Sequence, residues 1–397
     1  MIDFSPLQKL GCRVGLCLLV LTPKVFATGR EDVRLNNLLE SHWQETLKHS
    51  PEMATSMGET KYNDQWSDHS VAEIEADRKW LLQTKLALNK ISFKKLSEDG
   101  QLNYQLFERE LDLDIEGKKF SGAYLEVDQM GSWMTELPET LKRMPMKTDR
   151  DFVNILARLE KVPTLIAQVT ERLKEGLKRG VTPPQVTLSP IHEQFDVVLK
   201  PGMDNPFLSY LKPSPQISNE SLRKKYATQA EKLLSEKLLP CFKEFKNFFE
   251  KEYYPKARKT VAMADLPDGK NWYAYAVKKY TTTQQTPEEI HKIGLAEVKR
   301  IRSEMQKILK QLKFKGSLES FNQKLRTDKR HYYKTADELL ASYRDIAKRA
   351  DPELIKLFGK LPRLPYGVIP IPDYMAPGAP TAYYYPGNVK ASQPGFF

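Results

Sequence analysis

The sequence contains few cysteines and no long apolar segment. Only three cysteines, Cys12, Cys17 and Cys241, occur among its 397 residues. The first two lie in an N-terminal segment that we expect to be removed, which leaves Cys241 without a partner for an internal disulfide. No run of residues reaches the ~20 apolar positions of a membrane-spanning helix. A chain of this length without either feature must be stabilised by a large packed core.

The sequence also lacks the short motifs of most enzyme classes. It has no Gly-x-Ser-x-Gly elbow, phosphate-binding loop or dinucleotide-binding fingerprint. His192-Glu193 begins like a zinc-binding helix, but Asp196 stands where the second imidazole belongs, and we interpret it as a surface pair. Glu288 and His291 have the Glu-x-x-His spacing of di-iron bundles, but no second copy of the motif occurs. The apolar neighbours of Cys241 indicate a core thiol rather than a nucleophile.

Charge is in modest excess on the basic side. Lys and Arg total 62 against 51 acidic residues, which gives a net charge of +11. The densest basic run, residues 299–315, leaves an apolar helical stripe intact, so we interpret it as a solvated face. No recognised nucleic-acid motif accompanies it, and we expect no nucleic-acid partner.

The first 27 residues have the pattern of a secretory signal peptide. Lys9 and Arg13 precede the apolar run Val14–Leu21, and small residues precede a cleavage position after Ala27. Cys12 precedes the apolar run, whereas a lipid-attachment cysteine would follow it. We therefore predict an exported protein, periplasmic in a bacterium, with no membrane attachment once residues 1–27 are removed.

Helical patterns dominate from about residue 31 to residue 359. Asp149 is expected to cap a long amphipathic helix that is kinked at Pro163 and ends at Gly180. The region 183–215 is rich in proline and reads as loop. Thr286-Pro287-Glu288-Glu289 predicts a helix start with a capping box.

The composition changes after residue 361. Residues 362–397 contain eight prolines and no helical periodicity. The segments 368–371 and 382–385 are short enough for edge strands, where proline is tolerated. The sequence ends on the apolar residues Phe396 and Phe397. Because an apolar, strand-like end is unusual for a natural terminus, we expect that the sequence has been cut.

Several segments together resemble bacterial domain-of-unknown-function family 885. The most specific block lies between residues 266 and 301, and weaker similarity covers nearly all of residues 30–397. The matching segments are LPDGKNWY (266–273), YTTT (280–283), TPEEIHKIGLAEVKRI (286–301), LPR (361–363), AYY (382–384), PGF (394–396), Pro51–Gly58 with Tyr62, and Arg158–Pro163.

The resemblance implies a mainly α, multi-helix architecture like that of exported zinc metallopeptidases, with a short β edge near the C-terminal end. Complete members carry a His-Glu-x-x-Pro-Gly-His-His element shortly after the Pro-Gly-Phe segment. This sequence ends at Phe397, before any such element. Zinc is therefore implied only for complete members, and we assign no catalytic residue, no metal ligand and no cofactor to this chain.

The predicted organisation is a signal peptide, 1–27, followed by one incomplete helical domain, 28–397. Within that domain we distinguish an N-terminal helical part (28–215), central helices (216–361) and a Pro-rich edge-strand segment (362–397). The resemblance places Tyr383, Tyr384, Pro394 and Gly395 near a substrate cleft, where an extended edge can pair with a peptide. The same aromatic side chains could instead pack a sheet against helices.

We therefore predict that this chain is the N-terminal portion of an exported zinc-metallopeptidase-like protein. It is expected to be inactive by itself and to have a peptide substrate as its partner. Two alternatives stay open: an exported helical peptide-binding protein without catalysis, and a non-functional gene remnant. The sequence gives no oligomeric state.

Overall fold

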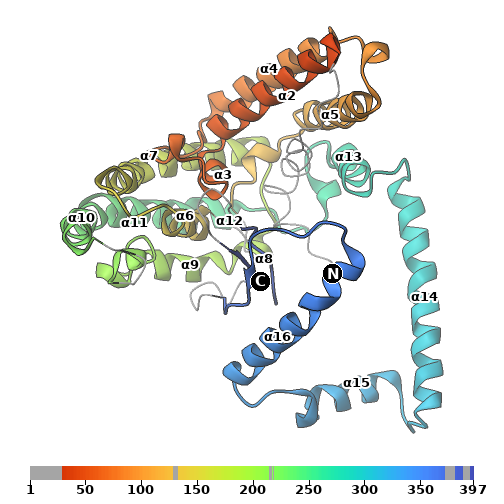
Figure 1. The fold of residues 1–397 in the computed structure, drawn as a ribbon. Helices are drawn as coiled ribbons and strands as arrows, with labels where there is room; N and C mark the ends of the chain where they lie inside the picture. The colour runs from red at the N-terminus through yellow and green to blue at the C-terminus, as the bar shows by residue number, and fades with distance from the viewer. Residues whose placement is uncertain (1–28, 128–132, 214–216, 218, 372–380, 388–393) are drawn as a thin grey trace. The chain divides into compact units, whose positions relative to one another are not determined.

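The computed structural model describes residues 29–127, 133–213, 217, 219–371, 381–387 and 394–397. It is mainly α-helical with one short sheet near the C-terminal end, which confirms the predicted fold class (Figure 1). The helices are α2 (Arg30–His49), α3 (Pro51–Ser56), α4 (Val71–Leu88), α5 (Glu98–Gly117), α6 (Trp133–Lys142), α7 (Asp149–Arg179), α8 (Gln185–Leu188), α9 (Ile191–Val198), α10 (Glu220–Leu233), α11 (Leu239–Phe248), α12 (Tyr254–Lys256), α13 (Gly269–Thr281), α14 (Pro287–Gln311), α15 (Leu318–Thr327), α16 (Ala336–Ala350) and α17 (Leu354–Leu357).

The described chain divides into two compact units. The first contains the residues up to Lys270, and the second contains the described residues from Asn271 onward. The predicted boundaries at 215 and 361 fall inside these units, and the division of the helical domain into three parts stays a prediction. The predicted signal peptide, 1–27, lies outside the described residues.

The first unit is built around α7. Its apolar stripe, which includes Phe152, Leu159 and Val169, is fully buried in the main hydrophobic core. The cap is Thr148, one residue earlier than predicted: its hydroxyl accepts from the Asp151 amide while the Asp151 carboxylate accepts from the Thr148 amide. The helix passes through Pro163 as one element and ends at Gly180, whose φ of 68° is the left-handed conformation that glycine adopts most readily.

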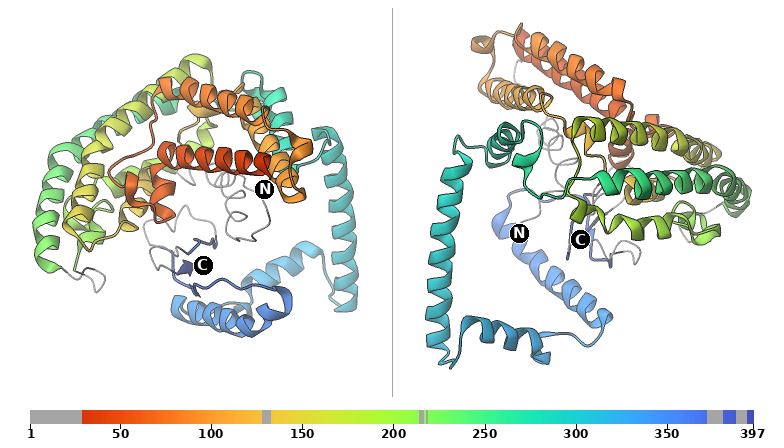
Figure 2. Two further views of the ribbon diagram at one scale, coloured as in Figure 1. Left: turned by 45° about the horizontal axis from the view of Figure 1, so that its top comes forward. Right: turned by 180° about the vertical axis from the view of Figure 1, so that it is seen from behind.

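Aromatic side chains fill the space beside α7. α10 and α11 run along it, and π-helical turns at 234–238 and 249–253 connect α10, α11 and α12 (Figures 1 and 2). Each π turn inserts one extra residue into the helix and so shifts the face that follows it. The buried residues that result include Phe242, Phe245, Phe249 and Tyr253.

A smaller group of helices packs separately at the start of the first unit. α2, α4 and α5 enclose a second core that contains Leu35, Leu88 and Phe107 (Figure 1). Asp32 in the first turn of α2 accepts hydrogen bonds from the amide and the hydroxyl of Ser97, the cap of α5. This carboxylate therefore joins the starts of two helices.

The Pro-rich region 183–215 is more helical than its composition predicts. It contains α8 and α9, and α9 buries Ile191, Phe195 and Val198. These apolar positions recur at i, i+4 and i+7, a helical spacing that the flanking prolines obscured. His192 is thus on a helix, where its Nδ1 lies 3.3 Å from Glu250 Oε1, as a side-chain pair.

Helices α14, α15 and α16 of the second unit bury little of their surface within the described residues. In α14 only Leu309 is buried, and neither α15 nor α16 has a buried residue. The predicted capping box at Thr286 and Glu289 is confirmed. His291, one turn into this helix, is exposed.

The short sheet lies in the second unit. Strand β1 (Tyr366–Gly367) runs parallel to β2 (Gly395–Phe396), with Tyr366 opposite Gly395. Tyr385 pairs with Phe396 on the other side of β2. The expected edge strands were placed at 368–371 and 382–385, whereas β1 ends at Gly367 and only Tyr385 of the second segment pairs, in a single bridge to Phe396.

Among the described residues, no helix combines the length and the apolar composition that crossing a bilayer requires.

Candidate functional site

The C-terminal sheet is built from three segments with β2 in the centre. On one side, the Gly395 amide donates to the Pro365 carbonyl and the Phe397 amide to the Gly367 carbonyl, at 3.3 and 2.9 Å. On the other side, Tyr385 and Phe396 exchange two backbone hydrogen bonds, at 2.7 and 2.9 Å. The middle strand is therefore saturated, and any additional strand has to join at an outer segment.

The segment 383–385 offers such an outer edge. Because Tyr385 directs its amide and carbonyl toward Phe396, the peptide groups of the preceding residue face away from β2. Within the described part of the chain, the amide and carbonyl of Tyr384 make no hydrogen bond. The Tyr384 side chain is 56% exposed. This residue presents one donor, one acceptor and an aromatic ring at an open sheet edge.

The four residues predicted near a substrate cleft lie together in this sheet. The Tyr384 ring covers Gly395 so closely that a Cβ on Gly395 would come within 3.0 Å of three ring and hydroxyl atoms of Tyr384. Tyr383 meets Tyr385 edge to face, with ring centroids 5.2 Å apart. Pro394 directly precedes β2 and is half-buried. The structure thus places all four at one sheet, and their role in binding stays a prediction.

Helix α16 fixes the opposite edge of the sheet. Arg344 Nε donates to the Val368 carbonyl at 3.0 Å. The Tyr366 hydroxyl bonds to the Ala347 carbonyl at 3.0 Å and to Asp351 Oδ1 at 3.1 Å. Hydrogen bonds from Lys348 and then Tyr366 hold the pKa of the Asp351 carboxyl below its ordinary value. The β1 side is anchored, so the Tyr384 side is the accessible edge.

Zinc does not fit the described residues. Within them, no group of three His, Cys, Asp or Glu side chains is arranged to hold an ion. His49 lies between two carboxylates: its Nδ1 is 2.7 Å from Glu73, and its Nε2 is 3.8 Å from Glu45. Since the two nitrogens point to opposite sides of the ring, these groups cannot converge on one metal.

A buried polar cluster in the first unit has a structural arrangement rather than a metal-binding one. Arg172 pairs with Glu126, and Nδ1 of His69 lies 3.2 Å from the other oxygen of Glu126. Arg172 also donates to the Ser70 carbonyl at 3.1 Å. Burial raises the pKa of the neighbouring Tyr253 hydroxyl well above its ordinary value. The Glu126 carboxylate is thus neutralised by the Arg172 guanidinium and is not a free metal ligand.

Arg158 is a buried residue that the sequence reading did not single out. It is fully buried, and it donates to the carbonyls of Gln65, Pro51 and Tyr62 at 2.9, 3.1 and 3.4 Å. Its guanidinium lies 4.7 Å from the centroid of Trp66. Burial lowers the pKa of Arg158 to about 10. This side chain ties α7 to the segment 51–66, and both segments belong to the resemblance noted in the sequence.

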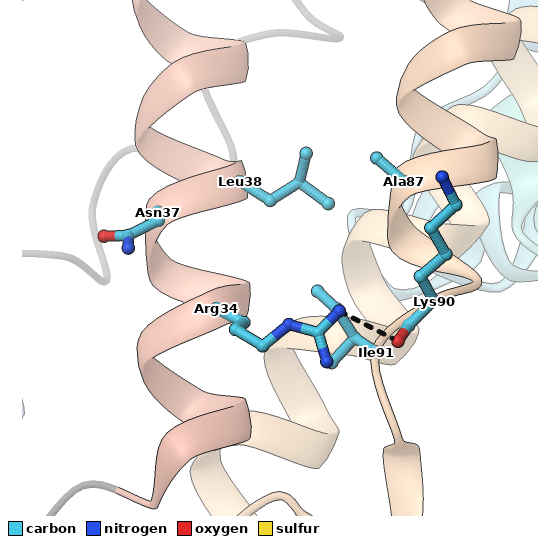
Figure 3. Close-up of a pocket in the computed structure, with 6 residues that line it drawn as sticks. All are labelled: Arg34, Asn37, Leu38, Ala87, Lys90 and Ile91. Carbon is cyan, nitrogen blue, oxygen red and sulfur yellow. Dashed lines mark hydrogen bonds between the residues drawn. The ribbon is translucent and has the colours of Figure 1, made fainter.

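A shallow cavity of about 290 Å³ lies between α2 and the end of α4 (Figure 3). Its lining residues are Arg34, Asn37, Leu38, Ala87, Lys90 and Ile91. The Arg34 guanidinium is already bonded to Glu31 at 2.8 Å and to the Lys90 carbonyl at 3.2 Å. The wall contains no carboxylate or imidazole, so this cavity does not bring together the groups of an acid–base or metal site.

Comparison with known proteins identifies the chain's relatives. The family described as "Bacterial protein of unknown function (DUF885)" matches residues 51–397. No curated protein matches the sequence. A crystal structure described as that of a "putative lipoprotein" from Colwellia psychrerythraea is similar over 92% of this chain, with a TM-score of 0.82 and 20% identity. The chain spans 66% of that protein's length, and at this identity the likeness establishes the shared fold.

Proposed function

This chain belongs to the DUF885 family of bacterial proteins, and from that premise we propose that it forms the peptide-binding portion of an exported, zinc-metallopeptidase-like protein. One observation carries the proposal. The sheet near the C-terminal end has a saturated central strand, an anchored edge at β1 and an open edge at Tyr384. An open edge of this kind is the structural requirement for binding an extended peptide by strand addition.

The chemistry of binding follows from the edge itself. The Tyr384 amide can donate to, and its carbonyl accept from, the backbone of an added strand, so main-chain hydrogen bonds supply affinity without regard to sequence. The exposed ring of Tyr384 provides apolar area for a side chain of the peptide. We therefore expect extended peptides with apolar or aromatic side chains to be preferred.

The proposal assigns binding, and no hydrolytic step, to the residues of this chain. The donor sets described above do not fit zinc, so no proton transfer or water activation is derived from them. The likeness to zinc peptidases comes from the sequence resemblance. This chain spans 66% of the length of the solved structure with the shared fold. A metal centre belonging to the same fold would then be held by residues other than those described here.

Fluorescence anisotropy with a labelled extended peptide tests the binding. Tyr384→Pro removes the edge donor, whereas Tyr384→Ala keeps it and removes only the ring. We expect the wild-type chain to bind the peptide saturably, and addition of EDTA should leave this binding unchanged. The Tyr384→Pro variant should not bind the peptide, and the Tyr384→Ala variant should bind it more weakly than the wild-type chain. Equal binding by the wild-type chain and both variants would rule out the edge as the site.

We further propose that the protein is exported, with residues 1–27 removed. The signal-peptide pattern supports this, as does the description of the Colwellia protein as a lipoprotein. Cys12 and Cys17 lie before and within the apolar run, so a lipid anchor at either is not part of the proposal. Mass spectrometry of the protein recovered from bacterial periplasm should give an N-terminus at Thr28. Recovery of uncleaved chain from the cytoplasm alone would contradict export.

A further inference from the structure

The cavity between α2 and the end of α4 has an apolar wall. Ile91, which is 6% exposed, forms part of this wall together with Leu38 and Ala87. In Figure 3 the side chains of Leu38 and Ala87 face each other across the cavity. A volume of about 290 Å³ is at the lower end of the range of ligand pockets, so the cavity suits a small aliphatic group rather than a drug-sized molecule.

Two cations border the apolar wall, and they differ in how far they are engaged. The Arg34 guanidinium is bonded to Glu31 at 2.8 Å and to the Lys90 carbonyl at 3.2 Å. Within the described residues, the Lys90 ammonium makes no hydrogen bond and no ion pair. Figure 3 shows this ammonium on the α4 side of the cavity, near Ala87. One carboxylate set against two cations leaves the positive charge of Lys90 unpaired at the cavity.

An apolar wall beside an unpaired ammonium matches an amphipathic monoanion. A carboxylate on Lys90 would make charge-assisted hydrogen bonds, and an aliphatic chain attached to it would remove the apolar wall from water. A cation would be repelled by Lys90 and Arg34, and a neutral aliphatic molecule would leave the ammonium without a partner. A dianionic phosphate would exceed the single unpaired charge and would have no apolar part to cover the wall.

We propose that this cavity binds a small aliphatic carboxylate, with the chain of the ligand against the apolar wall and its carboxylate on Lys90. Two sources carry this chemistry: a free short-chain acid, and the C-terminal residue of a peptide that ends in an aliphatic amino acid. The cavity belongs to the first unit, whereas the Tyr384 edge belongs to the second. Occupancy of the cavity therefore does not depend on strand addition at the sheet.

Titration of the full chain with small acids, followed by NMR at low ionic strength, tests the proposal. The probes are 4-methylpentanoate for the free acid and N-acetyl-leucine for the peptide end. Their amides, which lack the charge, are the control ligands. The variants are Lys90→Gln, which removes the ammonium, and Ala87→Leu, which fills the space opposite Leu38. Lys232→Gln, at an exposed lysine of α10, is the matched control.

We expect at least one of the two acids to bind the wild-type chain and Lys232→Gln alike, with a Kd of about 1 mM. Loss of the charge, in Lys90→Gln or in the amide, should weaken binding about tenfold, and Ala87→Leu should abolish it. The acid that binds identifies the source of the ligand.

Three results would overturn the proposal: no saturable binding of either acid, equal binding of an acid and its amide, or equal binding by the wild-type chain and Lys90→Gln. Tyr384→Pro should bind the acids as the wild-type chain does, because it changes only the second unit. Failure at the cavity and failure at the sheet are thereby distinguished.

Discussion

At the scale of single residues, Arg158 is a fully buried cation of the first unit that donates to backbone carbonyls. It contacts three carbonyls that lie between 93 and 107 positions earlier in the sequence. Sequence patterns could place Arg158 on α7, but they could not identify its partners, because backbone acceptors are present at every residue. Only the folded path of 51–66 brings these acceptors together.

Replacement of Arg158 by Met should therefore be severe. Each buried carbonyl left without a donor costs about 1–3 kcal/mol, so we expect the free energy of unfolding to fall by at least ~3 kcal/mol. The measurement is urea unfolding followed by circular dichroism, with Arg78→Met on the exposed face of α4 as the control. A loss below about 1 kcal/mol, the range of ordinary surface changes, would show that water satisfies these carbonyls.

Cys241 gives a second prediction at this scale. Burial, and then the nearby Glu244, raise the pKa of its thiol from 9.0 to about 11. The folded state thus favours the neutral thiol, and this contribution to stability is present below pH 9 and lost as the pH rises toward 11. The Cys241 side chain is half-buried against the main core, in agreement with the expected core thiol.

The alkylation rate of Cys241 by iodoacetamide tests this prediction. Peptide mapping separates Cys241 from Cys12 and Cys17. Because the thiolate is the nucleophile, the rate at Cys241 in folded protein should stay low at pH 8 and rise up to pH 11. In urea the rate should reach half its maximum near pH 9, the ordinary pKa of the thiol, and level off above it. Equal rates in folded and unfolded chain at pH 8 would refute the raised pKa.

At the scale of elements, helix ends were the features that the sequence predicted best. Thr286 with Glu289 and Gly180 stand where capping chemistry placed them, since caps depend on neighbours within four residues. The cap of α7 was missed by one residue because Thr148 and Asp149 are both acceptable caps. α8 and α9 were missed because proline outweighed a short apolar period. The Tyr385–Phe396 pairing could not be foreseen, since it depends on contacts between separate segments.

The start of α14 can be tested alone. Thr286→Ala removes the hydroxyl that accepts from the Glu289 amide at 3.2 Å, which should cost about 1 kcal/mol. Amide hydrogen exchange should speed up in the first turn of α14 and stay unchanged in α7. Thr228→Ala, whose hydroxyl bonds only within the interior of α10, is the control. Unchanged protection in the first turn would mean that the cap contributes nothing.

At the scale of the molecule, the two units differ in how much they bury. The described residues of the first unit form large hydrophobic clusters around α7 and between α2, α4 and α5, whereas α15 and α16 of the second unit have no buried residue. Opening free energy follows local burial, so the units should not unfold together. Family membership could be read from the sequence, but this imbalance could not, because the amphipathic stripes of α7 and α14 look alike until their partners are known.

Hydrogen exchange across the whole chain should show this difference. We expect amides of α14 and α16 to exchange with opening free energies of a few kcal/mol, well below those of α7. Uniform protection in both units would contradict the description of the second unit as incompletely packed.

The central claim is that an extended peptide joins the sheet beside Tyr384. The most direct measurement is the exchange rate of the Tyr384 amide, resolved by NMR, with and without saturating peptide. The account predicts that bound peptide slows exchange at Tyr384 and leaves the Tyr385 amide, already bonded to Phe396 at 2.7 Å, nearly unchanged. Peptide that binds the chain while Tyr384 continues to exchange at its free rate would place the binding site elsewhere and contradict the account.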